Sequence, residues 1–459
     1  MSIGNLRSKF NELTLISADH WDYRGTSKSA RDFVHGLCTY PAMMVPKMQR
    51  EILDVCVSQI EKNAPTLLDP FAGSGTILVE GMLKGLDIVG IDVNPLAVLL
   101  CKAKTTIIDP NILNEHVIAL KTLIVQSNKK EVNPHNFNGI EKWFTNKAIR
   151  DLSIIRNAIM KDNDITIRRF FWTAFCEIVR MVSNSRDCTY KLHIKEKSDI
   201  DNYDKDALEL FSSTLDMNVK KYISFYAALN DKNLLRNNGS AYKHSVSIVL
   251  ADATSYLKHS RKKYDLIITS PPYGDNHTTV SYGQYSVMPL RWIDCYDIDE
   301  SVDDEVISTL CAIDNVSLGG KSSKKSITAK RKKVISKSIT LKKQCDDIEV
   351  AANKQLNKLI AFYSDYDLFL KSISKKMSPG AISVWTLGNR TIAKKEIYMD
   401  KIMMELSEFY GLSFVTSFTR RIINKRMPEI NAYTGSDNDQ QTTMTTEHIL
   451  VLVKEGTNE

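Results

Sequence analysis

The chain has 459 residues, of which 43% are hydrophobic and 25% charged, as in an ordinary globular protein. It contains no apolar run near the ~20 residues that cross a bilayer, and its amino-terminal segment lacks the apolar stretch of a secretory signal, so we expect a cytoplasmic location. The eight cysteines are scattered without zinc-ligand spacing, which is typical of reduced thiols and predicts no metal site.

Positive charge is concentrated in one segment. The net charge of the chain is +7, whereas residues 318–344 alone contain ten lysines and arginines and no acidic residue. Basic runs of this kind are often arms that contact nucleic acid, although a solvated loop without a partner has the same composition. We interpret residues 301–350 as a basic, mobile loop whose run 318–344 contacts nucleic-acid phosphates.

The pattern from about residue 30 to 105 alternates between helix and strand. Periodicity predicts a helix over 46–63, a buried strand over 66–70, a helix over 75–85, a strand over 87–94 and a helix from Pro95. A strand, a glycine-rich turn, a helix and a second strand form a βαβ unit. We therefore interpret residues 1–105 as the first, cofactor-binding part of an α/β core.

The remaining elements complete that core after a long interruption. Helical periodicity dominates residues 106–240, which we interpret as a helical insertion. Strands return in 241–300, at residues 245–253 and 264–272. In 351–459 the sequence predicts a long helix ending near Pro379 and Gly380 and then three strands, the last two an antiparallel pair that closes the sheet. The predicted class is α/β, a Rossmann-like sheet with a large helical insertion.

The first chemical motif is DPFAGSGT, residues 69–76, between a strand and a helix. Glycines there let the backbone approach a ligand, and a helix start presents free N–H groups. Asp92 ends the next strand, where a carboxylate can accept both hydroxyls of a ribose. The turn matches neither a dinucleotide fingerprint nor a P-loop. Asp69 before the turn favours a cofactor with a cationic amino group, such as S-adenosylmethionine, over a merely structural glycine turn.

The second motif is TSPPYGD, residues 269–275, directly after a predicted strand. Two prolines fix the chain and leave their carbonyls free as acceptors. The Ser270 hydroxyl adds an acceptor, and Tyr273 adds a ring for stacking. This set suits a planar ring with an exocyclic amino group, which means a nucleobase, although a rigid loop explains the motif when it is taken alone.

Together the two motifs resemble those of the amino-group DNA methyltransferases of bacterial restriction-modification systems. In that family an FxGxG motif binds S-adenosylmethionine and a (S/D/N)PP(Y/F/W) motif holds the target base. The resemblance extends to HGLCTYPAMMVP at 35–46, which is similar to the family's amino-terminal cofactor motif, and to the stretches 270–286, 385–391, 420–428 and 443–454. It therefore spans both ends of the chain, while the basic run and 106–240, which the resemblance makes a candidate DNA-contacting region, match only loosely.

The resemblance implies a role for each matching position. The residues at the methionine part of the cofactor would be Asp69, Phe71, Gly73 and Gly75. Asp92 would bind the ribose and Asp252 the adenine amino group. The wall of the same pocket would be formed by Tyr40, Pro41 and Ala42. The catalytic motif would be Ser270, Pro271, Pro272 and Tyr273. The partners implied are double-stranded DNA and a cognate restriction endonuclease.

The expected product is N4-methylcytosine. Family members with serine at the first catalytic position mostly methylate cytosine, and those with aspartate or asparagine mostly methylate adenine. A neutral serine can also donate a hydrogen bond to N3 of cytosine, which an ionised aspartate cannot. No proline of this chain is followed by cysteine, which argues against methylation at carbon 5.

Three alternatives stay open. The first is adenine-N6 methylation. The second is RNA guanine-N2 methylation, whose enzymes pair similar motifs but usually carry an RNA-binding domain before them, for which the segment before residue 35 is short. The third is an inactive DNA-binding protein, which the intact motifs disfavour. The weaker site candidates are His35 and His277, for which a structural role is the more usual one, and Asn389–Arg390 and Arg420–Arg421, for which surface salt bridging is equally open.

Overall fold

The computed structural model describes most of the chain. The residues outside the description are 1, 16–20, 22–30, 187–188, 203–204, 237, 275, 277–278, 303, 321–323, 350–352, 393–394, 423–429, 433–439, 443–444 and 457–459. His277 and part of the stretch 420–428 therefore lie outside the described residues. No helix among the described residues is long and apolar enough to span a membrane. None of the seven cysteines described forms a disulfide.

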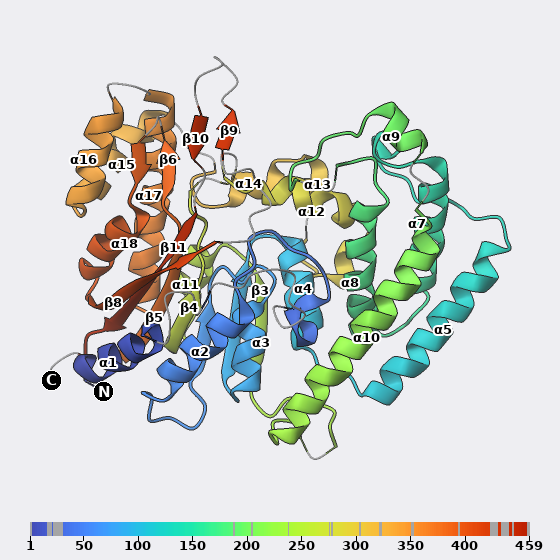
Figure 1. Cartoon of the computed structure of the whole chain (residues 1–459), viewed down its shortest axis with the longest axis horizontal. Helices are drawn as coiled ribbons and strands as arrows, with labels where there is room; N and C mark the ends of the chain where they lie inside the picture. Colours follow the sequence, from blue (N-terminus) through green and yellow to red (C-terminus); the bar gives the residue numbers. More distant parts are fainter. Residues whose placement is uncertain are drawn as a thin grey trace.

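A seven-stranded sheet with the order β3-β2-β1-β4-β5-β11-β8 forms the centre of the molecule (Figure 1). The strands β1 to β5 pair in parallel, and β11 is antiparallel to both of its neighbours. Their bounds are β1 Thr66–Asp69, β2 Asp87–Asp92, β3 Val246–Leu250, β4 Tyr264–Thr269, β5 Met377–Leu387, β8 Leu412–Arg421 and β11 Thr446–Lys454. The expected α/β class, the Rossmann-like sheet and the closing antiparallel pair are confirmed.

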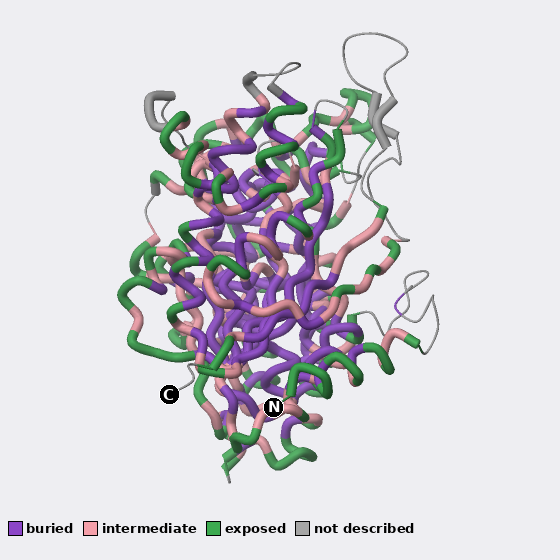
Figure 2. The backbone as a smooth tube through the Cα atoms, turned by 90° about the vertical axis from the view of Figure 1, so that its left-hand side faces the viewer, coloured by how far each residue is buried: buried purple, intermediate pink, exposed green. Residues whose placement is uncertain are grey.

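Alternating side chains divide the core between the two faces of the sheet. Leu67 packs on one face and Leu68 on the other, as the period of two in a strand requires. The first face is covered by α1 Ile3–Thr14, α2 Pro46–Val57, α3 Thr76–Leu83 and α4 Pro95–Thr105, and the second by α11 Ala253–His259, α17 Asn353–Ser374 and α18 Met399–Glu408. Figure 2 shows the buried backbone gathered along the middle of the molecule.

In its described part, the segment between α4 and β3 contains helices, the loops that connect them and two isolated bridges. These helices are α5 Pro110–Asn128, α6 Ile140–Trp143, α7 Asn146–Ile159, α8 Ile165–Met181, α9 Lys197–Asp201 and α10 Ala207–Asp231. They lie beside α4 at one end of the sheet (Figure 1). Phe170 and Tyr222 belong to the same apolar cluster as Leu67. The helical segment therefore shares the core of the sheet instead of forming a separate one.

The expected basic loop is wrong for the described part of 301–350. This part forms α13 Asp304–Ser308, α14 Ala312–Val316, α15 Lys324–Ile335 and α16 Ile339–Glu349. Val334 and Leu341 are buried in the apolar cluster on the second face of the sheet. Acidic residues elsewhere in the chain neutralise part of the charge. Lys337 lies 2.6 Å from Asp367 in a nearly buried ion pair.

The long helix also ends earlier than the sequence predicts. It stops at Ser374, and Pro379 and Gly380 lie inside β5. Between Tyr264 and Leu266 the pairing of β4 with β5 shifts register. Such a bulge accommodates a proline, which cannot donate to the ladder, and a glycine with φ of 75°.

The other described elements are short. They comprise the 3₁₀ helices η2 Phe33–Gly36 and η3 Cys295–Asp297, the helix α12 Tyr282–Leu290, and the two-stranded pairs β6 Arg390–Ile392 with β7 Lys395–Ile397 and β9 Ile430–Ala432 with β10 Gln440–Thr442.

Candidate active site

A pocket opens at the carboxyl ends of β1, β2 and β4. The strand order continues from β1 to β2 and β3 on one side and passes to β4 on the other. Ligands of open α/β sheets bind at this kind of switch point. The pocket encloses about 840 Å³, open solvent at its mouth included. The predicted residues that line it are Tyr40, Pro41, Ala42, Phe71, Gly73, Asp92, Asp252, Ser270 and Pro272.

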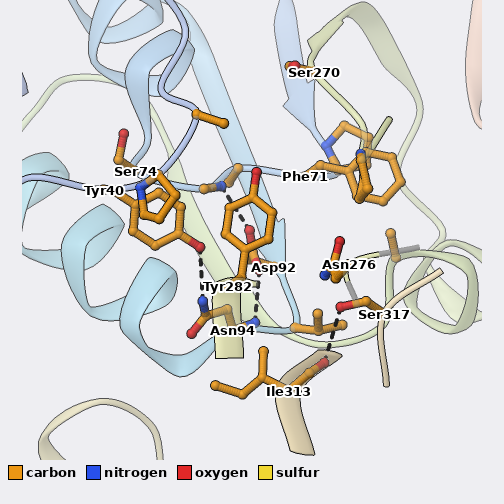
Figure 3. A pocket seen from close by; sticks show the side chains of 18 of the residues that line it. Tyr40, Phe71, Ser74, Asp92, Asn94, Ser270, Asn276, Tyr282, Ile313 and Ser317 are labelled. Atoms are coloured by element: carbon orange, nitrogen blue, oxygen red, sulfur yellow. Dashed lines mark hydrogen bonds between the residues drawn. The ribbon is translucent and has the colours of Figure 1, made fainter. Parts of the chain in front are cut away.

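The Asp92 carboxylate anchors the glycine turn. One oxygen accepts from Gly73 N at 2.8 Å, and the other accepts from Asn94 N at 2.8 Å, as Figure 3 shows. Gly73 has a φ of 50°, in the left-handed region that favours glycine. Each carboxylate oxygen has a second lone pair, so Asp92 can still accept hydroxyl groups from the pocket.

Gly75 has a packing role in the structure and does not line the pocket. Its φ is 77°, and it precedes the first residue of α3. A Cβ atom there would lie 3.0 Å from the Cys101 sulfur of α4. Glycine therefore allows α3 and α4 to approach each other behind the turn.

Asp69 lies behind the pocket wall, where its side chain is fully buried. One carboxylate oxygen accepts from the Thr269 hydroxyl at 2.6 Å and from Phe71 N at 3.1 Å. The other has no partner among the described residues. Burial raises the pKa of Asp69 to about 7, against the effect of these two hydrogen bonds. The Asp69 carboxylate therefore links β1 to β4. A direct contact between Asp69 and the cofactor requires the pocket wall to move.

The amino-terminal wall is held by Tyr40. Its hydroxyl accepts from the Asn94 side-chain amide at 2.9 Å, and that amide also donates to the Ser286 hydroxyl at 2.8 Å. Nearby His35 is almost fully buried and bonds Glu80 at 2.9 Å, and Glu80 also accepts from Arg50. His35 does not line the pocket, which favours its structural role.

The catalytic motif lies directly after β4. Ser270 and Pro272 line the pocket, whereas Pro271 is buried and Tyr273 lies to one side. The Tyr273 hydroxyl is 3.1 Å from Ser270 Oγ and donates to Glu447 at 3.3 Å.

Like His35, two more of the weaker candidates form contacts within the protein. Arg420 pairs with Glu447 at 2.6 Å. Asn389 is mostly buried, and its side-chain oxygen accepts from Met399 N. The structure therefore gives both residues internal partners.

Several lining residues were not identified from the sequence. Asn276 is 3% exposed, points into the pocket (Figure 3), and its side-chain oxygen has no partner among the described residues. Tyr282 lies in the middle of the same view. Both fall within the stretch 270–286, whose resemblance to the family was the available signal. The residues Ile313, Val316, Ser317 and Leu318 also line the pocket, and no motif indicated them.

The lining fits S-adenosylmethionine. Asp92 supplies a carboxylate for ribose hydroxyls, and Asp252 supplies a second at the same mouth while its side chain caps α11 by accepting from Ser255 N at 2.7 Å. The side-chain oxygen of Asn276, which has no partner within the described part of the chain, is placed to accept a hydrogen bond from a ligand. Phe71 and Tyr282 offer rings for an adenine. Three or more metal-ligating side chains do not cluster anywhere in the described part of the chain.

We expect the affinity for S-adenosylmethionine to fall as the pH is lowered from 7.5 to 5.5. Burial raises the pKa of Asp92 to about 6, opposed by the N–H groups of Asn94 and Gly73. Protonation below that value removes the charge that best accepts hydroxyl groups. When binding requires an ionised carboxylate, the affinity falls by up to about tenfold for each pH unit below the pKa of that carboxylate. Calorimetry across this range measures the slope, and an affinity that rises towards low pH would contradict the assignment.

The chain is 33% identical over 442 residues to the type II methyltransferase M.MvaI of Kocuria varians, across 95% of this chain and 94% of that protein. Two structures of the rRNA methyltransferase aviRa from Streptomyces viridochromogenes align over 94% of this chain and 95% of theirs, with 11% identity and a TM-score of 0.30. No family model matches the chain.

Proposed function

The chain belongs to the type II methyltransferases, and from this premise we propose that it methylates N4 of a cytosine flipped out of double-stranded DNA. The donor is S-adenosylmethionine, and the methylated sequence is protected from a cognate restriction endonuclease. One observation carries the proposal. Ser270 and Pro272 of the base-binding motif share a pocket with Phe71 and Asp92 of the cofactor motif.

The residues of the chain act by binding and orienting. When bound, S-adenosylmethionine supplies an electrophilic methyl group on its sulfonium sulfur. An amino group on an aromatic ring is a poor nucleophile because its lone pair is delocalised. Ser270 Oγ and the Pro271 carbonyl accept hydrogen bonds from this amino group, which draws the nitrogen towards sp³ geometry and localises the lone pair. Positioning and electrostatics then account for catalysis.

The target base must leave the duplex to reach Ser270. Flipped bases are commonly held by stacking on aromatic side chains and by hydrogen bonds to their edge. The ring of Tyr273, which is only partly buried beside the pocket, supplies the stacking surface. Asp92, Asp252 and Tyr40 hold the cofactor on the other side.

The choice of cytosine rests on serine at the first catalytic position, and adenine-N6 methylation is the competing product. Methylated plasmid DNA digested to nucleosides and separated by mass spectrometry distinguishes the two. We expect N4-methylcytosine. N6-methyladenine alone would overturn the cytosine assignment and leave the cofactor site standing, and no methylated nucleoside would favour an inactive DNA-binding protein. Methylation of RNA with DNA left unmodified would favour the guanine-N2 alternative.

The exposed lysines of α15 and α16 are proposed to contact DNA phosphates. Because this segment contributes core side chains, neutralising its exposed charges is a cleaner test than deletion. The test variant replaces four exposed lysines by glutamine: Lys332, Lys333, Lys342 and Lys343. We expect weaker binding to all DNA sequences alike and a shallower salt dependence, by about 0.9 in log–log slope for each phosphate that the variant no longer neutralises.

The matched control removes four exposed cations near the amino end of β4, at the opposite edge of the sheet from the pocket. These are Lys258, Arg261, Lys262 and Lys263. Their replacement should leave the salt slope unchanged. A changed sequence preference with an intact salt slope in the first variant would mean that the helices read bases instead of phosphates.

A further inference from the structure

The Tyr273 hydroxyl begins a hydrogen-bond chain to two charged residues, which lie on β11 and β8. Glu447 of β11 and Arg420 of β8 are cross-strand partners. Arg420 Nε and a terminal nitrogen donate to one Glu447 oxygen at 3.1 and 2.6 Å. The other Glu447 oxygen accepts from the Tyr273 hydroxyl at 3.3 Å, and this hydroxyl is 3.1 Å from Ser270 Oγ. The side chains of Arg420 and Glu447 are only 11% and 17% exposed.

The chemistry of these groups fixes the direction of the hydrogen bonds. Arginine can only donate, and an ionised carboxylate can only accept. The Tyr273 hydroxyl must therefore donate its single hydrogen bond to Glu447, which leaves the Tyr273 oxygen as an acceptor for Ser270. Ser270 in turn donates its only proton to Tyr273. The lone pairs of Ser270 Oγ are then the part of the hydroxyl that remains for a ligand in the pocket.

We propose that Glu447, held by Arg420, is a positioning residue that makes Ser270 an acceptor for the protons of the target amino group. The inference rests on the proposed function, and it deepens the role of Ser270. It also corrects the expected hydrogen bond from Ser270 to N3 of cytosine. A Ser270 proton given to Tyr273 is not available for N3 of cytosine, so Ser270 selects for an amino group and the ring of the base must be recognised by other residues.

Substitution of Glu447 by glutamine tests the direction of the chain. Because Arg420 only donates, the glutamine must turn its carbonyl towards Arg420 and its NH₂ group towards Tyr273. Tyr273 then donates to Ser270, and Ser270 directs its proton at the target amino group. We expect Glu447→Gln to lower kcat by about tenfold or more, the effect of misdirecting one hydrogen bond, with the KM for S-adenosylmethionine unchanged.

The double variant separates positioning from simple charge balance. Tyr273→Phe keeps the ring and breaks the chain, so Glu447→Gln should have no further effect on kcat when it is added to Tyr273→Phe. If Glu447 served only to neutralise Arg420, the two losses would multiply, and that result would overturn the inference. So would a Glu447→Gln variant with the kcat of the unmodified protein.

Two controls keep these outcomes interpretable. Glu455 follows the other end of β11, where it accepts from the Ser413 hydroxyl, and Glu455→Gln should leave kcat unchanged. Thermal melting and calorimetric binding of S-adenosylmethionine show whether each variant is folded. If the unmodified protein binds the cofactor and does not methylate DNA, the proposed function fails. If it methylates DNA and Glu447→Gln is fully active, only the positioning role fails.

Discussion

Replacing Ser270 by alanine is expected to abolish most turnover while leaving cofactor binding nearly intact. Ser270 lines the pocket, and its Oγ lies 3.1 Å from the Tyr273 hydroxyl. Removing an acceptor that acts on the reacting nitrogen removes stabilisation that is needed only in the transition state. By analogy with the loss of one oxyanion-hole donor, kcat should fall by about 100-fold or more.

Single-turnover kinetics and calorimetry measure the two effects separately. The matched control is Ser260→Ala, because Ser260 ends α11 just before the amino end of β4, at the opposite edge of the sheet. The control should behave like the unmodified protein. An equal loss of cofactor affinity and turnover in Ser270→Ala would show that Ser270 binds the cofactor and does not act on the target base.

The second large effect is expected for Asp92→Ala, which should weaken S-adenosylmethionine binding in a folded protein. The substitution removes a charged acceptor for the ribose and also the anchor for Gly73 N. Loss of a charged hydrogen-bond acceptor costs about 1.5–3 kcal/mol, which corresponds to roughly a 10- to 150-fold increase in Kd. Calorimetry measures the change, and a melting curve shows that the fold persists.

Asp87 provides the control within the same strand. It begins β2, and its carboxylate accepts from Ser245 N away from the pocket. Asp87→Ala should leave cofactor affinity unchanged, because the pocket lies at the other end of the strand. Unchanged affinity in Asp92→Ala, with a native melting curve, would remove Asp92 from the cofactor site.

Local patterns in the sequence were sufficient for the sheet and for most of the pocket. The strands before Pro70 and Ser270 were predictable because short apolar runs ended in residues with restricted backbones. The carboxyl ends of parallel strands meet at one edge of a sheet. The two motifs therefore lie together in the structure, although a long helical segment separates them in the sequence.

Features that depend on distant partners were not predictable. The charge of residues 318–344 indicated a solvated loop, because the acidic partner of Lys337, Asp367, lies in α17, beyond the basic segment. Asp69 was expected at the cofactor, but Thr269 of the neighbouring strand engages it behind the wall. Glu447 lies in the stretch 443–454 that resembles the family, but nothing in that stretch indicated its role, and the pairing of β11 with β5, the neighbour of β4, brings it to Tyr273.

Base-resolved methylation sequencing of a host that expresses the chain tests the central claim most directly. The claim is that one pocket joins the cofactor motif at Asp92 to the base-binding motif at Ser270 for transfer to cytosine N4. The account predicts N4-methylcytosine at a single short sequence with the unmodified protein, and a much smaller methylated fraction with Ser270→Ala. Methylation confined to adenine, or a methylated fraction in the Ser270→Ala variant equal to that of the unmodified protein, would contradict it.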